Sequence, residues 1–144
     1  MQIRAARAAD DDAIVALWQR CELTRPWNDP HRDLARKRTT QADGLLVAVT
    51  DEGVIVGTVM AGYDGHRGWI NYLAVDPAHR RQGLGRRLMD EARRYLGALG
   101  CPKINLQVRR GNSAALAFYS ALGFAEDDSV SLGLRLVQDE AAKQ

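Results

Sequence analysis

Apolar side chains recur at helical spacing near the start of the chain. One stripe follows Asp10, whose carboxylate is suited to cap a helix N-terminus. A second helix is expected to begin where Asp29 precedes Pro30 and to run to about Thr40. Its residues are mostly polar, which indicates an exposed helix. The apolar residues of the first stripe are Ile14, Leu17, Trp18 and Cys21.

The pattern then changes to that of strands. Residues 45–49 and 54–63 are rich in β-branched and other apolar side chains, and a tight turn separates them. A third run, residues 69–75, follows the turn at 64–68. Three successive strands with short turns predict an antiparallel meander, and residues 3–6 predict a short strand before it.

Helical spacing returns in the second half of the chain. Residues 84–99 carry an apolar stripe that Gly100 ends, and residues 104–108 read as the next strand. Residues 112–122 predict a last helix, and 131–137 a closing strand. The strand–helix–strand order predicts a crossover, so the third strand of the meander and the strand at 104–108 should be parallel. A mixed sheet with helices on both faces follows.

Composition limits the classes of protein that fit. The 144 residues, 46% hydrophobic and 26% charged, suit one soluble globular domain spanning 1–144 and exclude a disordered or fibrous chain. The formal net charge of +2 gives no reason to expect nucleic acid or membrane as a partner. Cys21 and Cys101 lie far apart without metal-type spacing, so no metal site is expected. No signal peptide or membrane span is evident, which favours the cytoplasm.

A glycine-containing turn separates the third strand from the long helix. Gly83 and Gly85 have no Cβ, so a ligand can approach their N–H groups closely. The N-terminus of the following helix offers unpaired donors, while Arg81 and Arg86 add permanent charge. These features predict a pyrophosphate cradle; a plain turn followed by a solvated basic helix face stays open as the alternative. The segment matches neither the GxxxxGK(S/T) phosphate loop nor the GxGxxG dinucleotide motif.

A second motif lies on the last predicted helix. The pattern N-x-x-A-x-x-x-Y-x-x-x-G-F is matched by Asn112, Ala115, Tyr119, Gly123 and Phe124. With the pattern R/Q-x-x-G-x-G/A at 80–85, this resembles the GNAT superfamily of acyl-CoA-dependent N-acyltransferases over essentially the whole chain. The strings at 25–30 and 62–68 are further similar to the small bacterial YpeA group of that superfamily.

The resemblance implies a fold and a cofactor. The GNAT fold is an α/β (α+β) domain with a mixed sheet of about six to seven strands, splayed between the fourth and fifth, and about four helices. The resemblance implies that the pantetheine arm of acetyl-CoA pairs with the backbone of Leu73, Ala74 and Val75 in that gap. Asn112 resembles the cofactor-contacting asparagine of the family, and it is equally suited to cap its own helix. The cradle residues are Arg81, Gln82, Gly83, Leu84, Gly85 and Arg86.

Tyr119 resembles the general acid of the family. A phenol has a pKa near 10, so its hydroxyl is protonated at neutral pH and can protonate a leaving thiolate. A core tyrosine on an amphipathic helix is the structural alternative. The general base stays open, because Gln107 stands where N-terminal-acetylating relatives carry a glutamate. Asp64, His66, Tyr72 and a water relay are the candidates.

Four residues are candidates for acceptor binding. Trp27 lies in the loop between the two early helices, a region that covers the acceptor site in this family, and packing against the sheet is its alternative role. Tyr63, Asp64 and His66 lie near the turn before the third strand of the meander. Asp64 also fits a purely structural turn role, and His66 fits a solvated one.

The expected activity is transfer of an acetyl group from acetyl-CoA to a primary amine, by direct attack in a ternary complex. The amine belongs to a small molecule or to a peptide. A protein N-terminal or lysine acetyltransferase is one alternative, and a catalytically silent acyl-CoA-binding sensor is another. The expected partners are the acceptor alone, without nucleic acid or membrane, and the chain is expected to be a monomer or homodimer.

Overall fold

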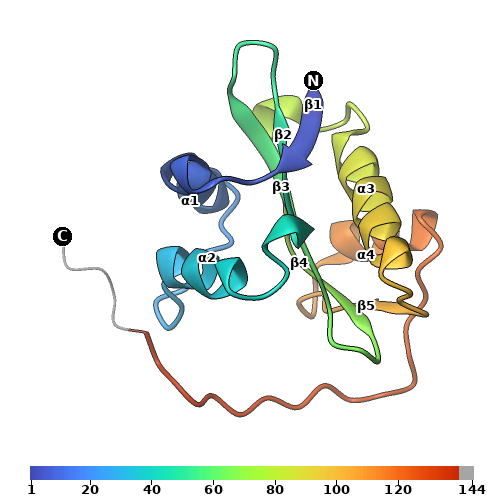
Figure 1. Cartoon of the computed structure of the whole chain (residues 1–144). Helices are drawn as coiled ribbons and strands as arrows, with labels where there is room; N and C mark the ends of the chain where they lie inside the picture. Colours follow the sequence, from blue (N-terminus) through green and yellow to red (C-terminus); the bar gives the residue numbers. More distant parts are fainter. Residues whose placement is uncertain (140–144) are drawn as a thin grey trace.

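A central sheet separates two pairs of helices. The structure is a computed structural model and describes residues 1–139. Helices α1 and α2 lie on one side of the sheet, and α3 and α4 on the other (Figure 1). In chain order the elements are β1 Gln2–Ala5, α1 Asp11–Arg20, α2 Pro30–Arg38, β2 Leu45–Val49, β3 Ile55–Tyr63, β4 Gly68–Val75, α3 Leu84–Ala98, β5 Ile104–Leu106 and α4 Ser113–Ala121.

The strands lie in the sheet in the same order as in the sequence. Its order is β1-β2-β3-β4-β5; the first four strands are antiparallel, and β5 runs parallel to β4. The predicted meander and the predicted parallel crossover are therefore confirmed. The crossover passes through α3, as expected for parallel neighbours that a tight turn cannot join.

The helix starts show which capping predictions hold. The carboxylate of Asp29 accepts the amides of His31 (2.9 Å) and Arg32 (3.4 Å), and Pro30 occupies the first helical position of α2. Asn112 accepts the amide of Ala115 at 3.1 Å and caps α4. The prediction for Asp10 is wrong, because its carboxylate makes no capping bond to α1 and binds Arg4 at 2.8 Å instead.

Each face of the sheet has its own hydrophobic cluster. On the side of α1 and α2, Trp18 is fully buried and donates its indole N–H to Thr58 Oγ1 at 2.9 Å. The Thr58 hydroxyl in turn donates to the carbonyl of Tyr72 at 2.8 Å. On the other side, α3 buries its stripe of Leu84, Leu88, Met89, Ala92 and Leu96 against β3 and β4. Together the two clusters hold β4 in place from both sides.

The closing strand is the one predicted element that does not join the sheet. Within residues 1–139 the sheet has five strands, fewer than expected, and 131–137 is not among them. This part of the chain instead runs in extended form from the end of α4 across to α2 (Figure 1). Strand propensity alone fixes no partner, because pairing also requires backbone contact with a sheet edge.

Candidate active site

The two parallel strands separate after a few residues. Gly68–Ile70 of β4 pairs with Ile104–Leu106 of β5, and the pairing ends there. Just beyond, β4 contains a bulge in which two residues lie opposite one residue of β3, and Tyr72 has a positive φ of 51°. The bulge turns the end of β4 away from β5. The splay predicted between the fourth and fifth strands is thus present.

The end of β4 directs part of its backbone into this gap. The amide of Asp76 donates to the carbonyl of Val56 at 2.8 Å, which sets the alternation of the ladder with β3. By that alternation, Ala74 turns its backbone groups to β3, whereas Leu73 and Val75 turn theirs to the gap. The carbonyl of Val75 accepts the side chain of Arg80 at 3.2 Å. Leu73 is therefore the best placed of the three predicted residues to pair with an extended ligand.

A cavity of about 680 Å³ opens where the strands part. Its walls come from the loop before α2, from α2, from β4, from the segment after β5 and from α4. Trp27, Asn112, Gln107 and Tyr119 from the sequence analysis lie in its lining. The other lining residues include Leu23, Arg25, Asn28, Asp33, Arg36, Lys37, Thr40, Met60, Tyr72, Leu73 and Arg109.

Tyr119 lies in that lining on α4. Its ring makes edge contacts with Phe118 and Phe124, with centroids 5.1 and 5.7 Å away. Burial raises the pKa of the Tyr119 hydroxyl above its ordinary value. The group is consequently protonated over the whole neutral range, as a general acid must be.

The predicted cradle forms a second cavity of about 490 Å³ at the start of α3. Gly83 occupies the N-cap position with φ of 75°, a left-handed conformation that favours glycine. A Cβ on Gly85 would lie 3.2 Å from the ring of Phe118, so a side chain would narrow this space. The first helical bond of α3 is donated by Arg87 to Gly83, which leaves the amides of Leu84, Gly85 and Arg86 directed outward.

His79 also lines this second cavity, and sequence reasoning missed it. Its Nδ1 is buried and has no hydrogen-bond partner within residues 1–139. A buried polar atom without a partner costs free energy unless a ligand or water satisfies it. A pyrophosphate group fits this site for three reasons: the amides at the start of α3 point outward, Gly85 adds no side chain, and the buried Nδ1 of His79 has no other partner. Acetyl-CoA therefore fits the residues present.

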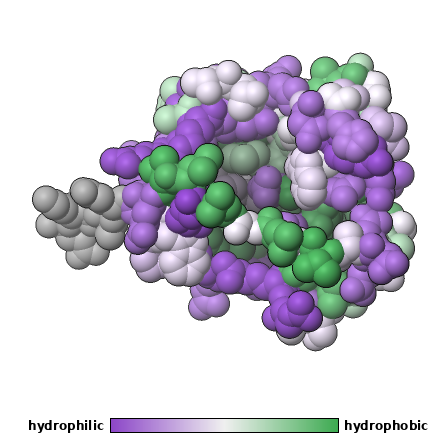
Figure 2. Space-filling model, turned by 90° about the horizontal axis from the view of Figure 1, so that it is seen from below, coloured by the Kyte–Doolittle hydropathy of each residue, from purple (hydrophilic) through white to green (hydrophobic). Residues whose placement is uncertain are grey.

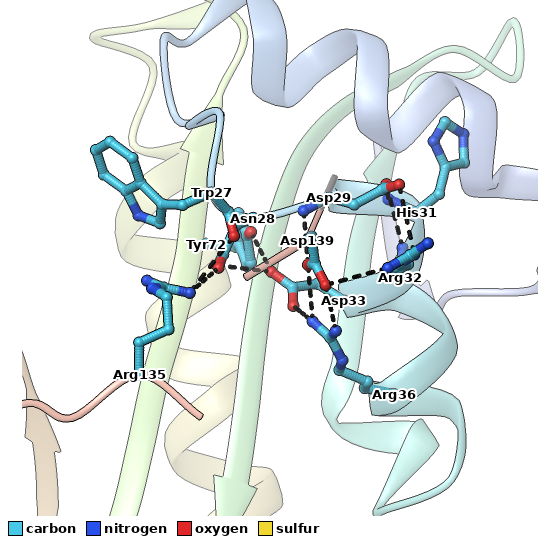
Figure 3. Close-up of polar contacts among 10 residues, drawn as sticks. All are labelled: Trp27, Asn28, Asp29, His31, Arg32, Asp33, Arg36, Tyr72, Arg135 and Asp139. Carbon is cyan, nitrogen blue, oxygen red and sulfur yellow. Dashed lines mark hydrogen bonds and ion pairs between the residues drawn. The ribbon is translucent and has the colours of Figure 1, made fainter. Parts of the chain in front are cut away.

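A polar cluster forms one wall of the larger cavity (Figure 3). Tyr72 donates its hydroxyl to Asp33 Oδ2 at 2.7 Å, and Asn28 Nδ2 donates to the same oxygen at 3.2 Å. Arg36 donates to the other oxygen of Asp33 at 2.9 Å. Burial raises the pKa of Tyr72 most, and the hydrogen bond to Asp33 raises it further. Tyr72 thus stays protonated, which removes it as the base.

Asp33 was not identified from the sequence. It is the one carboxylate in the cavity lining among residues 1–139. Among the basic side chains of the same lining, Lys37 donates its Nζ to the carbonyl of Ala61 at 2.7 Å, and burial lowers the pKa of Lys37. Asp33 and Tyr72 are 39 positions apart in the sequence. Only the bulge in β4 and the position of α2 bring them together.

The other predicted acceptor residues lie apart from this cavity. Asp64 accepts the amides of Arg67 and His66, both at 2.8 Å, in the turn between β3 and β4. These backbone hydrogen bonds lower the pKa of Asp64. The bond from Arg67 has the larger effect, and the bond from His66 has the next largest. The hydroxyl of Tyr63 donates to the carbonyl of Gly65 at 3.2 Å. The turn reading of Asp64 therefore accounts for its contacts, and neither His66 nor Tyr63 lines the cavity.

The C-terminal segment is anchored beside the cavity. Asp139 is 2% exposed and accepts the amide of Asp29 at 2.8 Å and Arg36 Nη2 at 2.6 Å. The amide of Asp139 donates to the carbonyl of Trp27 at 3.2 Å, and Arg135 donates to Asn28 Oδ1 at 2.9 Å (Figure 3). Sequence reasoning found no role for this segment beyond a strand.

The comparisons with known proteins agree with this geometry. The sequence profile described as the acetyltransferase (GNAT) family matches residues 12–124, so the chain belongs to this family. Its GNAT fold is shared by solved structures. Ard1 from Thermoplasma volcanium has a TM-score of 0.77 and 25% identity over 86% of this chain and 82% of that one.

Two other similar structures come from different kinds of acetyltransferase. The ribosomal-protein-S18-alanine N-acetyltransferase from Escherichia coli has a TM-score of 0.72 and 26% identity, covering 88% of this chain and 78% of that one. An aminoglycoside 6′-N-acetyltransferase from Acinetobacter haemolyticus has a TM-score of 0.74 and 21% identity, over 96% and 100% of the two chains. The fold is thus common to enzymes named for a ribosomal protein and for an aminoglycoside.

Residues 1–139 show neither a membrane-spanning helix nor a metal-binding cluster. No helix in this part of the chain has the length and apolar character needed to cross a membrane. The same residues contain no group of three His, Cys, Asp or Glu side chains placed to hold a metal ion.

Proposed function

We propose that this protein transfers the acetyl group of acetyl-CoA to a primary amine, by direct attack in a ternary complex. One observation carries the proposal: the splay of β4 and β5 opens a cavity that contains Tyr119. A second cavity, at the α3 cradle, offers outward amides for a pyrophosphate. The reducing cytoplasm suits two cysteines that are both free thiols.

The cofactor would be held by backbone more than by side chains. The amides at the start of α3 bind the pyrophosphate, with charge from Arg81 and Arg86 and a further contact from His79. Leu73, in the lining of the larger cavity, and Val75, in that of the second cavity, would turn backbone groups to the pantetheine arm, and Asn112 lies at the larger cavity. Bound acetyl-CoA supplies the activated acetyl thioester.

Tyr119 supplies the proton that the leaving sulfur needs. When an amine attacks the acetyl carbon and the C–S bond breaks, the Tyr119 hydroxyl would donate its proton to the leaving sulfur, and the proton that the nitrogen loses as the amide forms would return to the Tyr119 oxygen through water. Because burial raises the pKa of Tyr119, this proton is available at any pH below about 10. Deprotonation of the Tyr119 hydroxyl therefore does not limit the rate in that pH range.

The acceptor is proposed to bind beside Asp33. Its carboxylate, which also pairs with Arg36 at 2.9 Å, would attract the ammonium form of an amine, and Tyr72 and Asn28 hold that carboxylate in place. The exposed ring of Trp27 lies in the same lining and offers a cation–π contact. An ammonium with a pKa near 10.4 must lose a proton before attack. We assign that proton to water in the open cavity, because Gln107 cannot accept it and Asp33 already accepts hydrogen bonds from three side chains.

The test is thiol release from acetyl-CoA against amines, polyamines, amino acids and short peptides, beside calorimetric binding of acetyl-CoA. Turnover with one class of amine, with kcat/KM rising toward the pKa of that amine, would support the proposal. Binding without turnover on any acceptor would favour the acyl-CoA sensor. Failure to bind acetyl-CoA would contradict both.

The nature of the acceptor is the second part of the proposal. We favour a small amine over a protein N-terminus because Gln107 replaces the glutamate of the N-terminal-acetylating relatives. Turnover on protein N-termini or lysines alone would overturn that choice. Membership of the YpeA group rests on the strings at 25–30 and 62–68, and it is proposed on that basis only.

A further inference from the structure

The lining of the larger cavity carries more positive than negative charge. Asp33 is its one acidic residue within 1–139. Its basic residues are Arg25, Arg36, Lys37 and Arg109. Arg36 is already neutralised, because it donates to Asp33 at 2.9 Å and to Asp139 at 2.6 Å. The other three basic side chains form no ion pair with a carboxylate of the described chain.

Lys37 is the most buried of these cations. It is 8% exposed, and its Nζ donates to the carbonyl of Ala61 at 2.7 Å. Lysine is rarely buried unless a full negative charge pairs with it, and a carbonyl carries only a partial one. An ammonium has three donors, so Lys37 has donors left for a ligand. Lys37 follows Asp33 by one turn of α2, so the two residues share one face of this helix.

Arg25, in the loop before α2, has a guanidinium that the backbone holds in place. Its Nη1 donates to the carbonyls of Glu22 at 2.9 Å and of Thr24 at 2.8 Å. Its Nε and Nη2 donate to no group within residues 1–139, and these two atoms form the fork that a carboxylate matches. The amide of Asn28 donates to the carbonyl of Arg25 at 3.1 Å, and the Asn28 side chain donates to Asp33. Asn28 thus positions Arg25 and Asp33 relative to each other.

Acetyl-CoA does not account for these cations. Its negative charges lie on its phosphates, whereas its pantetheine arm and acetyl group are uncharged. The proposed site for the pyrophosphate is the second cavity, at the start of α3, and neither Arg25 nor Lys37 lines that cavity. The negative charge that would pair with Arg25 and Lys37 therefore belongs to the acceptor.

We propose that the acceptor is a free amino acid, a small molecule that carries both a primary amine and a carboxylate. This inference rests on the acetyl transfer proposed above. The amine binds beside Asp33, and the carboxylate binds Arg25 and Lys37, with further positive charge from Arg109. The acetyl group moves to the amine nitrogen, and the carboxylate takes no part in bond making. A polyamine is disfavoured, because its second ammonium would lie among cations.

The surface of the molecule allows a zwitterion to approach. The underside is hollowed near its centre, and hydrophilic residues, in purple, lie between the apolar patches around that hollow (Figure 2). A charged small molecule that approaches from this side meets no continuous apolar surface.

The first test compares amino acids with the amines that lack only their carboxylate. Suitable pairs are phenylalanine with phenethylamine and lysine with cadaverine, and thiol release from acetyl-CoA gives the rate. We expect kcat/KM to be at least about tenfold higher for the amino acid of a pair, as for one hydrogen bond between charged groups.

The second test removes the cations one at a time. Arg25→Gln and Lys37→Gln each remove a charge and keep a hydrogen-bond donor for the backbone carbonyls. The preference for the amino acid over its matched amine should fall about tenfold in each variant. Arg38→Gln is the control on α2, because Arg38 pairs with Asp11 and lies outside both cavities. It should keep the preference of the wild type, whereas a general structural defect would lower the rates with both members of a pair equally.

Calorimetric titration of amino acids into the chain saturated with CoA tests the acceptor site without turnover. Binding that weakens in Arg25→Gln and Lys37→Gln, but not in Arg38→Gln, would support the site even if no acceptor were acetylated, a result that contradicts the proposed transfer alone. Turnover of amines without a carboxylate at rates equal to those of amino acids would overturn this inference and leave acetyl transfer intact. Neither binding nor turnover of any amino acid would also overturn it.

Discussion

The hydroxyl of Tyr119 is the group on which the proposed chemistry depends most. Tyr119→Phe removes the proton donor and keeps the ring that packs against Phe118 and Phe124. We expect kcat to fall about 100-fold, the lower end for loss of a positioned general acid. Calorimetric affinity for acetyl-CoA should not change. Steady-state kinetics and calorimetry on the same preparation test this.

Tyr95→Phe is the matched control for that variant. Tyr95 lies on α3, outside both cavities, and donates its hydroxyl to Asp43 at 2.7 Å. Its loss should leave kcat unchanged. Equal activity of wild type and Tyr119→Phe would exclude Tyr119 as the acid.

A second prediction at this scale concerns Asp33. Asp33→Asn keeps the shape of the side chain and removes the charge that would attract an ammonium. We expect kcat/KM for a cationic amine to fall about tenfold, as for a lost charged hydrogen bond. Affinity for acetyl-CoA should stay the same. The effect should be smaller for an acceptor amine of low pKa, which is already neutral in the assay.

Asp43→Asn is the control for Asp33→Asn. Asp43 accepts a tyrosine hydroxyl at the same 2.7 Å distance as Asp33 does, but it lies outside the cavities. An equal loss of activity in both variants would indicate a general structural effect. Loss confined to Asp33→Asn supports acceptor binding.

At the scale of elements, the start of α3 is the most sensitive point. Gly85→Ala places a Cβ 3.2 Å from the ring of Phe118, so either the ring shifts or the cradle narrows. We expect the Kd for acetyl-CoA to rise about tenfold, equivalent to about 1.4 kcal/mol. Calorimetry on the purified variant measures this.

Gly97→Ala is the control on the same helix. No atom lies within 4 Å of a Cβ at Gly97, and alanine favours a helix over glycine by up to about 1 kcal/mol. This variant should bind acetyl-CoA normally and unfold at a slightly higher temperature. Unchanged binding in Gly85→Ala would show that the cradle does not contact the cofactor.

The helix starts show why much of the fold could be predicted. Caps such as Asp29 with Pro30, and Asn112, act on amides two or three residues away, so local sequence identifies them. The stripe of α3 is equally local. The closing strand failed because its formation depends on a sheet edge outside the local sequence. Asp10 failed because Arg4, a neighbour on β1, takes its carboxylate.

The residues of the candidate site also divide into those that local sequence predicts and those that only the fold brings together. The motifs predict the residues of the proposed cradle and Tyr119, since each motif lies within one short segment. Asp33 and Tyr72 carry no local signal, because a bulge in β4 brings together residues 39 positions apart. His79 was missed because only packing leaves its Nδ1 buried without a partner.

At the scale of the whole molecule, Asp139 ties the end of the described chain to α2. Two hydrogen bonds lower the pKa of Asp139. The one from the Arg36 side chain has the largest effect, followed by the one from the amide of Asp29. A carboxyl whose pKa falls on folding adds stability above its unfolded pKa of about 3.9 and loses it as the pH drops below that value. Asp139→Asn should therefore unfold at a lower temperature near neutral pH.

The difference between wild type and Asp139→Asn should shrink as the pH falls from about 4 to 2. Thermal unfolding followed by circular dichroism at each pH measures it. Asp128→Asn, an exposed acidic residue of the same segment, should track the wild type. A difference between wild type and Asp139→Asn that stays constant with pH would show that this carboxylate is not the titrating anchor.

The stack of Trp18 on Tyr72 gives the protein a built-in optical reporter. The two rings lie 3.7 Å apart at 10°, and Trp18 is fully buried, whereas Trp27 and Trp69 are 40% and 38% exposed. The far end of Tyr72 holds Asp33 in the cavity wall. A molecule that takes Asp33 from Tyr72 disturbs the ring beneath the indole. Its arrival should be visible as a change in the intrinsic fluorescence of the unlabelled protein.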